Sequence, residues 1–152
     1  AVATSPCLTL GLAHGRNFGA GVDLFAACRH RLASADTTFR MPGLRFGLVL
    51  GTRRFGAIVG AEKAARIQEE SATFNAAEAQ AMGFVQRIVA PEDWPAAIEA
   101  AATTAAALDA TSRAALYRVL SDDRTDADLA ELVRSAARLG LKARIARYLG
   151  AG

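Results

Sequence analysis

The stretch Gly15-Arg16-Asn17-Phe18-Gly19-Ala20-Gly21-Val22-Asp23, followed by an apolar run from Leu24 to Cys28, decides the fold of this chain. Three small residues, Gly19, Ala20 and Gly21, stand where a predicted strand ends and a predicted helix begins. The start of a helix leaves backbone N–H groups without acceptors, and small residues let a ligand approach them closely. Such a turn can hold a negative charge that develops on an oxygen atom.

Asp23 lies about one helical turn into the predicted helix, close enough to move protons near the same spot. The alternative is a structural role, as a first-turn acid stabilised by the helix dipole. The turn has an alternative role as well, because many glycine-rich turns only permit a tight bend. It is not a dinucleotide fingerprint, since the third glycine and the later acidic residue are missing, and the chain has no lysine-containing phosphate loop.

Short β segments and helices alternate up to Pro91, and only helices are predicted after it. The predicted strands are Cys7–Ala13, Arg31–Ala33, Thr38–Phe39 and Phe84–Val89. The predicted helices are Ala20–Arg29, Thr52–Val59, Ala61–Glu70, a capping-box helix from Asn75 and Glu78 to Ala81, Glu92–Leu108, Thr111–Leu120, Asp126–Leu139 and Leu141–Leu149. We therefore predict an α/β core over residues 1–90 and a helical region over residues 91–152, with Trp94 as a packing anchor between them.

Composition indicates a soluble globular chain of 152 residues, with 52% apolar residues and a net charge of +3. No apolar run reaches the roughly 20 residues of a membrane span, and no signal peptide is recognisable, so we expect a cytoplasmic location and no membrane partner. Cys7 and Cys28 are expected to be buried free thiols of a reducing compartment. No cluster of His, Cys, Asp and Glu has metal-ligand spacing, so we expect no metal.

Several spaced motifs between Leu8 and Pro91 occur in one order, which is far more specific than any one of them. They are His14-Gly15 with Gly19-Ala20-Gly21 and Leu24, then Cys28-Arg29 and Arg31-Leu32-Ala33-Ser34-Ala35-Asp36, then Phe39-Arg40-Met41-Pro42-Gly43-Leu44-Arg45-Phe46-Gly47, then Gly51-Thr52-Arg53-Arg54 with Val59-Gly60, and Ala76-Ala77-Glu78-Ala79-Gln80-Ala81-Met82-Gly83-Phe84-Val85. This order resembles the enoyl-CoA hydratase/isomerase (crotonase) superfamily.

The resemblance implies a crotonase-like spiral core acting on acyl-CoA thioesters, with a helical tail that supports homotrimers or hexamers. It implies that the backbone N–H of Ala20 stabilises the thioester enolate and that Asp23 is the acid/base. The substrate would contact Gly19, Gly21, Met41, Pro42 and Gly43. No separate cofactor is implied, because coenzyme A is part of the substrate. The expected reaction is the addition of water across, or the movement of, a double bond next to the thioester.

Three departures from the family pattern affect the expected chemistry. Hydratases of the family use two carboxylates, and the position of the second one is Gly43, which has no side chain. Asp23 is a shorter acid than the usual Glu, and the loop Leu50-Gly51-Thr52 is shorter than its family counterpart. The sequence therefore leaves a hydratase, an isomerase and a catalytically impaired pseudoenzyme open.

The resemblance also predicts a front half that precedes this sequence. That half would carry the second oxyanion N–H group and most of the coenzyme A contacts. We therefore expect the 152 residues to be the back portion of a larger protein, and to be inactive alone.

Basic residues suggest one further class of function. Arg134, Arg138, Lys142, Arg144 and Arg147 form a helical stripe that could bind RNA phosphates or an acidic partner, which would make the protein an acyl-CoA/RNA-binding scaffold. Five acidic residues precede the stripe, so we favour a solvated helix face and do not expect nucleic acid as a partner. Arg53-Arg54 is expected to be mostly structural, through salt bridges, rather than to bind coenzyme A phosphates. His14 is expected to satisfy a loop hydrogen bond, with substrate contact as the alternative.

Overall fold

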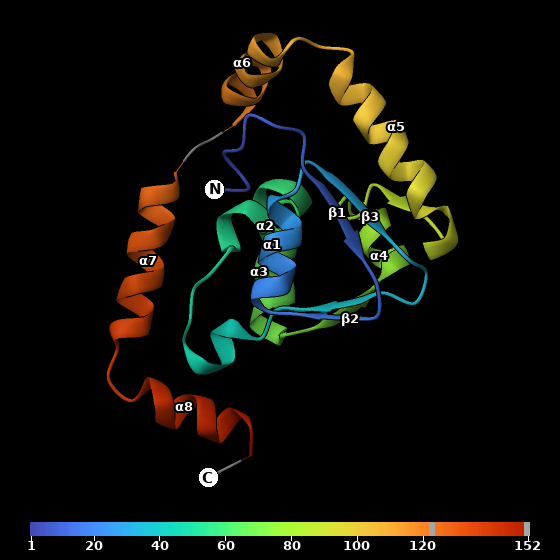
Figure 1. Cartoon of the computed structure of the whole chain (residues 1–152). Coiled ribbons are helices and arrows are strands. Elements are labelled where there is room, and N and C mark those ends of the chain that lie inside the picture. The colour runs from blue at the N-terminus through green and yellow to red at the C-terminus, as the bar shows by residue number, and fades with distance from the viewer. Residues whose placement is uncertain (122–123, 151–152) are drawn as a thin grey trace.

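The computed structural model describes residues 1–121 and 124–150, and Figure 1 shows a small α/β core from which helices extend on two sides. The strands are β1 (Leu10–Ala13), β2 (Arg16–Phe18), β3 (His30–Ala33), β4 (Thr38–Arg40), β5 (Thr73–Asn75) and β6 (Arg87–Ile88). The α-helices are α1 (Ala20–Ala27), α2 (Thr52–Val59), α3 (Ala61–Glu70), α4 (Ala76–Ala81), α5 (Trp94–Ala106), α6 (Ala110–Leu120), α7 (Thr125–Ala137) and α8 (Leu141–Tyr148), with 3-10 turns η1 (Gly43–Phe46) and η2 (Pro91–Asp93). The predicted mixed α/β class and the helical C-terminal region are confirmed.

Two three-stranded sheets form the core, in the orders β1-β3-β6 and β2-β4-β5. All neighbouring strands are parallel except β4 and β5, which are antiparallel. The chain passes from the first sheet to the second within two residues after β1, and the two sheets lie at a steep angle to each other (Figure 1). Helix α1 follows the pair β1 and β2, and η1, α2 and α3 follow the pair β3 and β4, whereas α4 lies between β5 and β6.

The corner between the sheets is held by polar groups that replace missing sheet hydrogen bonds. Gly15, with φ of 55°, makes the turn, and its carbonyl accepts from the Thr38 N–H at 2.8 Å. The Thr37 hydroxyl donates to the Ala13 carbonyl at 3.0 Å, and Ser34 and Thr37 are both buried. Because a bent strand leaves backbone groups unpaired, these small hydroxyl side chains let the corner lie inside the protein.

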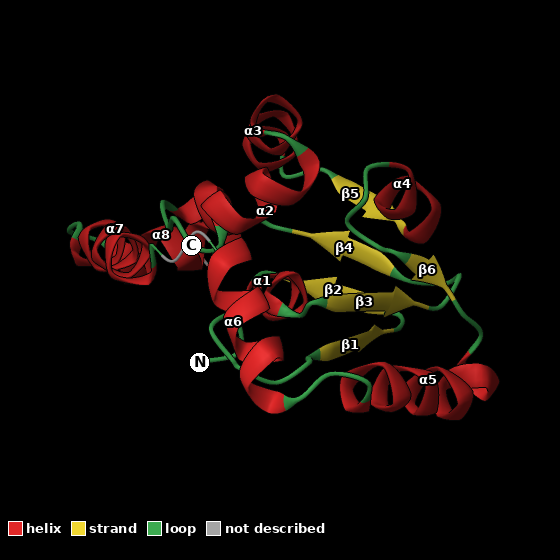
Figure 2. Cartoon of the chain, turned by 90° about the horizontal axis from the view of Figure 1, so that it is seen from above, coloured by secondary structure: helices red, strands yellow, loops and turns green. Residues whose placement is uncertain are grey.

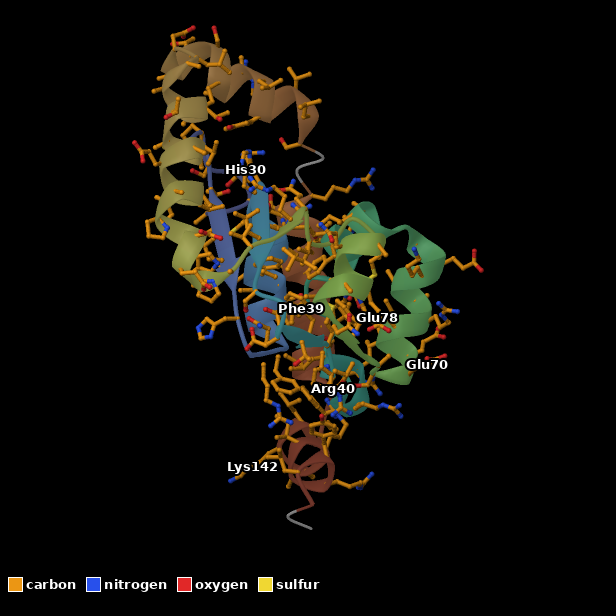
Figure 3. All side chains as sticks on the ribbon, turned by 90° about the vertical axis from the view of Figure 1, so that its right-hand side faces the viewer. His30, Phe39, Arg40, Glu70, Glu78 and Lys142 are labelled. Atoms are coloured by element: carbon orange, nitrogen blue, oxygen red, sulfur yellow. The ribbon has the colours of Figure 1, made fainter. Side chains whose placement is uncertain are left out.

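Five phenylalanines fill the space between the sheets and helices α1, α2 and α4. Phe39 is fully buried at the centre, with ring centroids 5.4 Å from Phe74 and 5.3 Å from Phe84. Phe25 and Phe55 complete the cluster. Figure 3 shows Phe39 inside the molecule and Lys142 far from it on α8. This rigid aromatic core fixes the position of α1, on which the candidate site depends.

Figure 2 shows the helices after Pro91 along two sides of the core, with α5 beside β1 and with α7 and α8 at the other end of the molecule. The Trp94 ring N–H donates to the Val89 carbonyl at 3.3 Å, and the ring packs on the cluster of Leu32, Val89 and Ala97. The predicted packing role of Trp94 is confirmed. The division of the chain into residues 1–90 and 91–152 stays a prediction.

Several predicted boundaries were wrong, for physical reasons. Residues 7–9 are not part of β1, and Cys7 is exposed rather than buried, while Cys28 is half-buried. The chain at 84–85 is not a strand, because the N–H groups of Phe84 and Val85 both bond back to the Ala79 carbonyl and close α4. Strands β2 and β5 were missed, since three-residue strands are too short to show alternation.

The predicted capping box at the start of α4 is confirmed. The Asn75 side chain accepts from the Glu78 N–H at 2.9 Å, and the Glu78 carboxylate accepts from the Asn75 N–H at 2.8 Å. Among residues 1–121 and 124–150, no helix combines the length and the apolar character needed to cross a bilayer.

Candidate active site

A cavity of about 230 Å³ lies at the N-terminal end of α1, and we call it the α1 cavity. Its wall is formed by Gly19, Ala20, Asp23, Met41, Gly43, Leu44, Phe46, Leu48, Leu50, Thr52 and Gln68. Most of these residues are apolar or lack a side chain, and Asp23 is the one ionisable residue in this wall. An apolar cavity with a few polar groups is the usual form of a small-molecule site.

The turn before α1 is held in place by the second sheet. Gly19 has φ of 50°, and its N–H donates to the Arg40 carbonyl at the end of β4, at 2.9 Å. Its carbonyl accepts the N–H groups of Val22 and Asp23. Within the described residues, the N–H group of Ala20 has no intramolecular acceptor, and Ala20 lines the α1 cavity. This N–H is therefore free to bind an oxygen atom of a ligand.

Asp23 extends from the first turn of α1 to the loop before α2, where its carboxyl group packs against the backbone of Gly51. Its Oδ1 is buried and has no hydrogen-bond partner in the part of the chain that the structure describes. Burial raises the pKa of Asp23 to about 7, and the positive charge of Arg54 opposes that rise. A carboxyl group with such a pKa gains and loses a proton readily at neutral pH.

Most of the predicted site residues meet at this cavity. Gly19, Ala20, Asp23, Met41 and Gly43 all line it. Pro42 is not among the lining residues, and Gly21 faces a separate depression beside β1. Among the described residues, no group of three or more His, Cys, Asp or Glu side chains is placed to hold a metal ion.

Gly43 sits in a tight place at the start of η1. A Cβ atom at this position would lie 3.1 Å from the Leu48 carbonyl oxygen, and the Leu48 N–H donates back to the Gly43 carbonyl. The short loop from Gly43 to Leu48 therefore closes tightly over the position where a second carboxylate is expected in the resembled family. This loop thus leaves little room for the side chain of an acid at residue 43.

Two polar residues of the wall were not predicted, Thr52 and Gln68. Gln68 is only 3% exposed on α3, next to the buried residues Ala64 and Ile67. A signal was present in the sequence, because Gln68 falls on the apolar face of the helix at a spacing of four from Ala64.

Residues from the far end of the chain hold the loop wall of the α1 cavity. The Arg144 Nε donates to the Phe46 carbonyl at 2.8 Å, and the Phe46 and Tyr148 rings lie 5.4 Å apart. The Val49 N–H donates to the Ser135 hydroxyl at 3.1 Å. Helices α7 and α8 therefore fix the position of a wall formed by residues 43–50.

Some residues of the basic stripe between Arg134 and Arg147 make contacts within the chain. Arg144 is half-buried and bonded to backbone carbonyls, and Arg134 pairs with Glu131 at 2.7 Å. Lys142 and Arg147 are exposed. Part of the stripe thus stabilises this chain itself.

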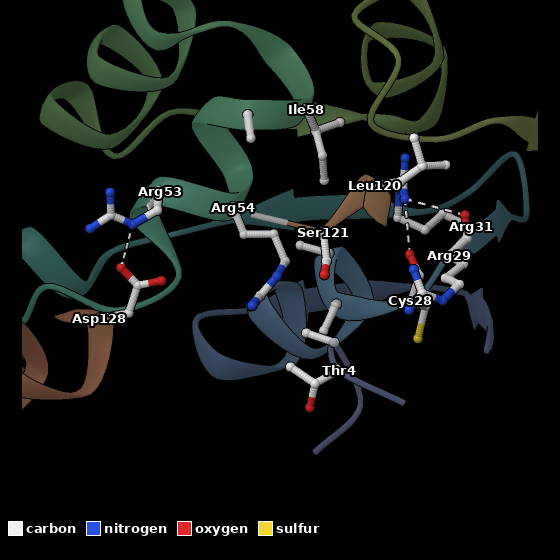
Figure 4. Close-up of a pocket in the computed structure, with 14 residues that line it drawn as sticks. Thr4, Cys28, Arg29, Arg31, Arg53, Arg54, Ile58, Leu120, Ser121 and Asp128 are labelled. Atoms are coloured by element: carbon white, nitrogen blue, oxygen red, sulfur yellow. Dashed lines mark hydrogen bonds and ion pairs between the residues drawn. The ribbon is translucent and has the colours of Figure 1, made fainter. Parts of the chain in front are cut away.

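A second cavity lies at the C-terminal end of α1, and several arginines line it (Figure 4). Arg53 pairs with Asp128 at 2.6 Å, and Arg31 donates to the carbonyls of Phe84 and Cys28. Arg29 lies over the Tyr117 ring at 3.7 Å. These guanidinium groups connect distant segments. The Arg53–Asp128 pair is the predicted salt bridge, whereas a structural role for Arg54 and the absence of coenzyme A binding stay predictions.

His14 lies outside the α1 cavity. Its side chain is exposed, and its ring centroid is 5.9 Å from that of Trp94. The loop hydrogen bond is made by its backbone carbonyl, which accepts from the Asn17 side chain at 3.1 Å.

Comparison with known proteins decides the family. The model of the Enoyl-CoA hydratase/isomerase family matches residues 1–141. The chain belongs to this family. A solved structure of a putative enoyl-CoA hydratase/isomerase from Bordetella parapertussis is 61% identical, with a TM-score of 0.96 over 97% of this chain and 62% of that one. An enoyl-CoA hydratase from Bacillus halodurans shares the hydratase/isomerase fold at 20% identity, with a TM-score of 0.79 over 96% of this chain and 62% of that one.

Curated relatives match shorter parts of this hydratase/isomerase chain. A probable enoyl-CoA hydratase of Mycobacterium avium is 33% identical over 96 residues, covering 61% of this chain and 37% of the relative. Ethylmalonyl-CoA decarboxylase of Mus musculus is 27% identical over 99 residues, covering 63% of this chain and 31% of the relative. The chain thus spans about a third of the length of these two relatives, and less than two thirds of the two solved structures.

Proposed function

We propose that this chain supplies the acid/base and one oxyanion donor of an enzyme that acts on enoyl thioesters of coenzyme A. One observation carries the proposal: Asp23, with a pKa raised to about 7, and the unbonded N–H of Ala20 belong to the wall of one apolar cavity. The family of the chain and the names of its relatives support the substrate class.

The reaction follows from what these two groups can do. The Ala20 N–H donates a hydrogen bond that stabilises the negative charge forming on the thioester oxygen when the substrate becomes an enolate. Asp23 takes or gives the proton at the carbon next to the thioester. Addition of water to the double bond and movement of the double bond both pass through that enolate, so both belong to the proposal. Coenzyme A enters as part of the substrate and no separate cofactor is needed.

The second oxyanion donor and most coenzyme A contacts are proposed to come from residues outside this sequence, as in the resembled family. A homotrimer or hexamer is proposed as the assembly. The exposed apolar side chains on α6 and α7 support it: Leu116, Val119, Leu120, Leu129 and Val133. Light scattering of the full-length protein measures the number of subunits.

Asp23→Asn in the full-length protein tests the proposed chemistry. The amide keeps the size of the side chain but does not exchange a proton, so turnover of crotonyl-CoA and of a 3-enoyl-CoA should fall by at least about 100-fold. Gel filtration and crotonyl-CoA binding should be unchanged. Equal turnover by the variant and the wild type excludes Asp23 from the mechanism. Binding without turnover in the wild type indicates the pseudoenzyme.

A further inference from the structure

Gln68 is a polar side chain in a place where α3 otherwise buries apolar ones. The buried residues of α3 are Ala64, Ile67 and Gln68, and Gln68 is 3% exposed. Burial of an amide is unfavourable unless each of its polar atoms finds a partner. Gln68 lies in the wall of the α1 cavity, so we expect each polar atom of its amide to have a hydrogen-bond partner.

Among the residues that the structure describes, only one end of the amide has such a partner. The Oε1 of Gln68 accepts from the Thr52 hydroxyl at 3.0 Å. Within the described residues, Nε2 is buried and has no acceptor. The Thr52 contact fixes the orientation of the amide, and it leaves Nε2 as an unused donor.

Asp23 lines the same cavity, and its carboxyl group offers an acceptor that complements the Gln68 donor. Asp23 packs against Gly51, the residue before Thr52, and its Oδ1 is buried without a donor. Asp23, Thr52 and Gln68 are the three polar side chains in the wall of this cavity. Among the described residues, the donor Gln68 Nε2 and the acceptor Asp23 Oδ1 of this wall make no hydrogen bond. Asp23 contacts Gly51, and Gln68 is bonded to the next residue, Thr52. A hydroxyl oxygen satisfies both, since it accepts one hydrogen bond and donates another.

We propose that Gln68 holds the water molecule that adds to the enoyl thioester, with its Nε2–H donating to the water oxygen while Asp23 accepts a water proton. Gln68 thereby takes the water-holding role of the carboxylate that Gly43 lacks. The same contact holds the hydroxyl oxygen of the product. This inference rests on the proposed function, and it selects hydration as the reaction of this site.

The step balances with one acid/base group. The water oxygen forms a bond to the β-carbon and loses one proton to the Asp23 carboxylate. The electron pair of the double bond moves to the thioester oxygen at the Ala20 N–H, and the enolate then takes the proton from Asp23 at its α-carbon. The sum is one water added, with no oxidant, reductant or metal consumed.

Two reactions of the full-length protein separate the role of Gln68 from that of Asp23. The first is hydration of crotonyl-CoA. The second is exchange of the α-proton of butyryl-CoA in D₂O, followed by NMR, which needs Asp23 and the Ala20 N–H but no added water. We expect Gln68→Met to lower kcat for hydration about 10-fold, as loss of one neutral hydrogen bond that positions the attacking water implies. KM for crotonyl-CoA and the exchange rate should stay within about twofold.

A matched control and a second substitution sharpen the result. Gln80→Met replaces an exposed glutamine of α4 and should leave both rates unchanged. Gln68→Glu keeps the shape of the side chain but donates only while its carboxyl group is protonated, so its hydration rate relative to the wild type should fall as pH rises. A hydration rate equal to that of the wild type at a pH where this carboxyl group is ionised overturns the role of Nε2 as the donor.

The remaining outcomes also decide the inference. Unchanged hydration in Gln68→Met, or an equal loss of hydration and exchange, overturns it. If Gln68→Met does not fold by circular dichroism, Thr52→Val is measured instead, since it releases the amide and keeps the glutamine. Slower hydration with normal exchange supports the inference in that variant, and unchanged hydration overturns it. A wild-type protein that exchanges but does not hydrate overturns the role of Gln68 alone, whereas one that does neither overturns the proposed function itself.

Discussion

The carboxyl group of Asp23 occupies the space that a side chain on Gly51 would need. A Cβ atom at residue 51 would overlap Oδ1 of Asp23 and lie 3.0 Å from the Asp23 Cβ. Gly51 has φ of 64° and is the N-cap of α2. The close fit between α1 and this loop removes Oδ1 from water, which is the main cause of the raised pKa of Asp23.

Gly51→Ala should therefore displace the acid as well as strain the backbone. We expect a loss of stability of about 1–2 kcal/mol from the left-handed φ and a fall in turnover of about 100-fold from the displaced carboxylate. Gly140→Ala is the matched control, because Gly140 also has a positive φ but an added Cβ meets nothing within 4 Å. Thermal unfolding and crotonyl-CoA turnover measure the two effects. Similar turnover in the two variants would show that the Asp23–Gly51 contact has no effect on the chemistry.

Stability should depend on pH through Asp23. Its pKa is raised from 3.8 to about 7 in the folded protein. Between these values the folded state binds a proton that the unfolded chain has lost, so the free energy of unfolding falls as pH rises. Asp23→Asn lacks this titration, and its melting temperature relative to the wild type should rise between about pH 4 and about pH 7. A difference that is constant over this range contradicts the raised pKa.

Arg54 and Arg53 should differ in their effect on Asp23, although they are neighbours. The charge of Arg54 lowers the pKa of Asp23, so Arg54→Met should move the midpoint of the pH–rate profile upward. Arg53 instead forms a partly exposed pair with Asp128, and Arg53→Met should leave the midpoint unchanged and cost less than about 1 kcal/mol. Equal shifts in both variants would mean that Arg54 has no specific effect.

Arg144 should control the mobility of the cavity wall. Arg144→Met removes the hydrogen bonds to the carbonyls of Phe46, Arg138 and Leu139. We expect amide hydrogen exchange at residues 43–50 to become about fivefold faster, as the loss of about 1 kcal/mol implies. Arg147→Met, on the exposed side of the same helix, is the control. Exchange that is equally slow in both variants would show that the tail does not hold the loop.

The sequence predicted the elements whose signals are local. The capping box of Asn75 and Glu78 and the glycine-rich turn before α1 depend on neighbouring residues, and both were found. The residues of the turn also placed Ala20 and Asp23 in one site, because they are three positions apart on one helix. The short strands β2 and β5 were missed, since their formation depends on pairing with β4 rather than on their own pattern.

Local sequence therefore determined the family of this chain, the position of the turn and the place of Asp23 on the first turn of α1. Tertiary structure alone decided the properties of that acid: the burial that raises its pKa, its contact with Gly51, and the cavity that it shares with Gln68 from another helix. It also decided that Arg144 and Ser135 hold a wall whose residues lie about ninety positions earlier in the chain. The physical reason is that hydrogen bonds within a turn need only neighbouring residues, whereas desolvation depends on every segment that packs around a group.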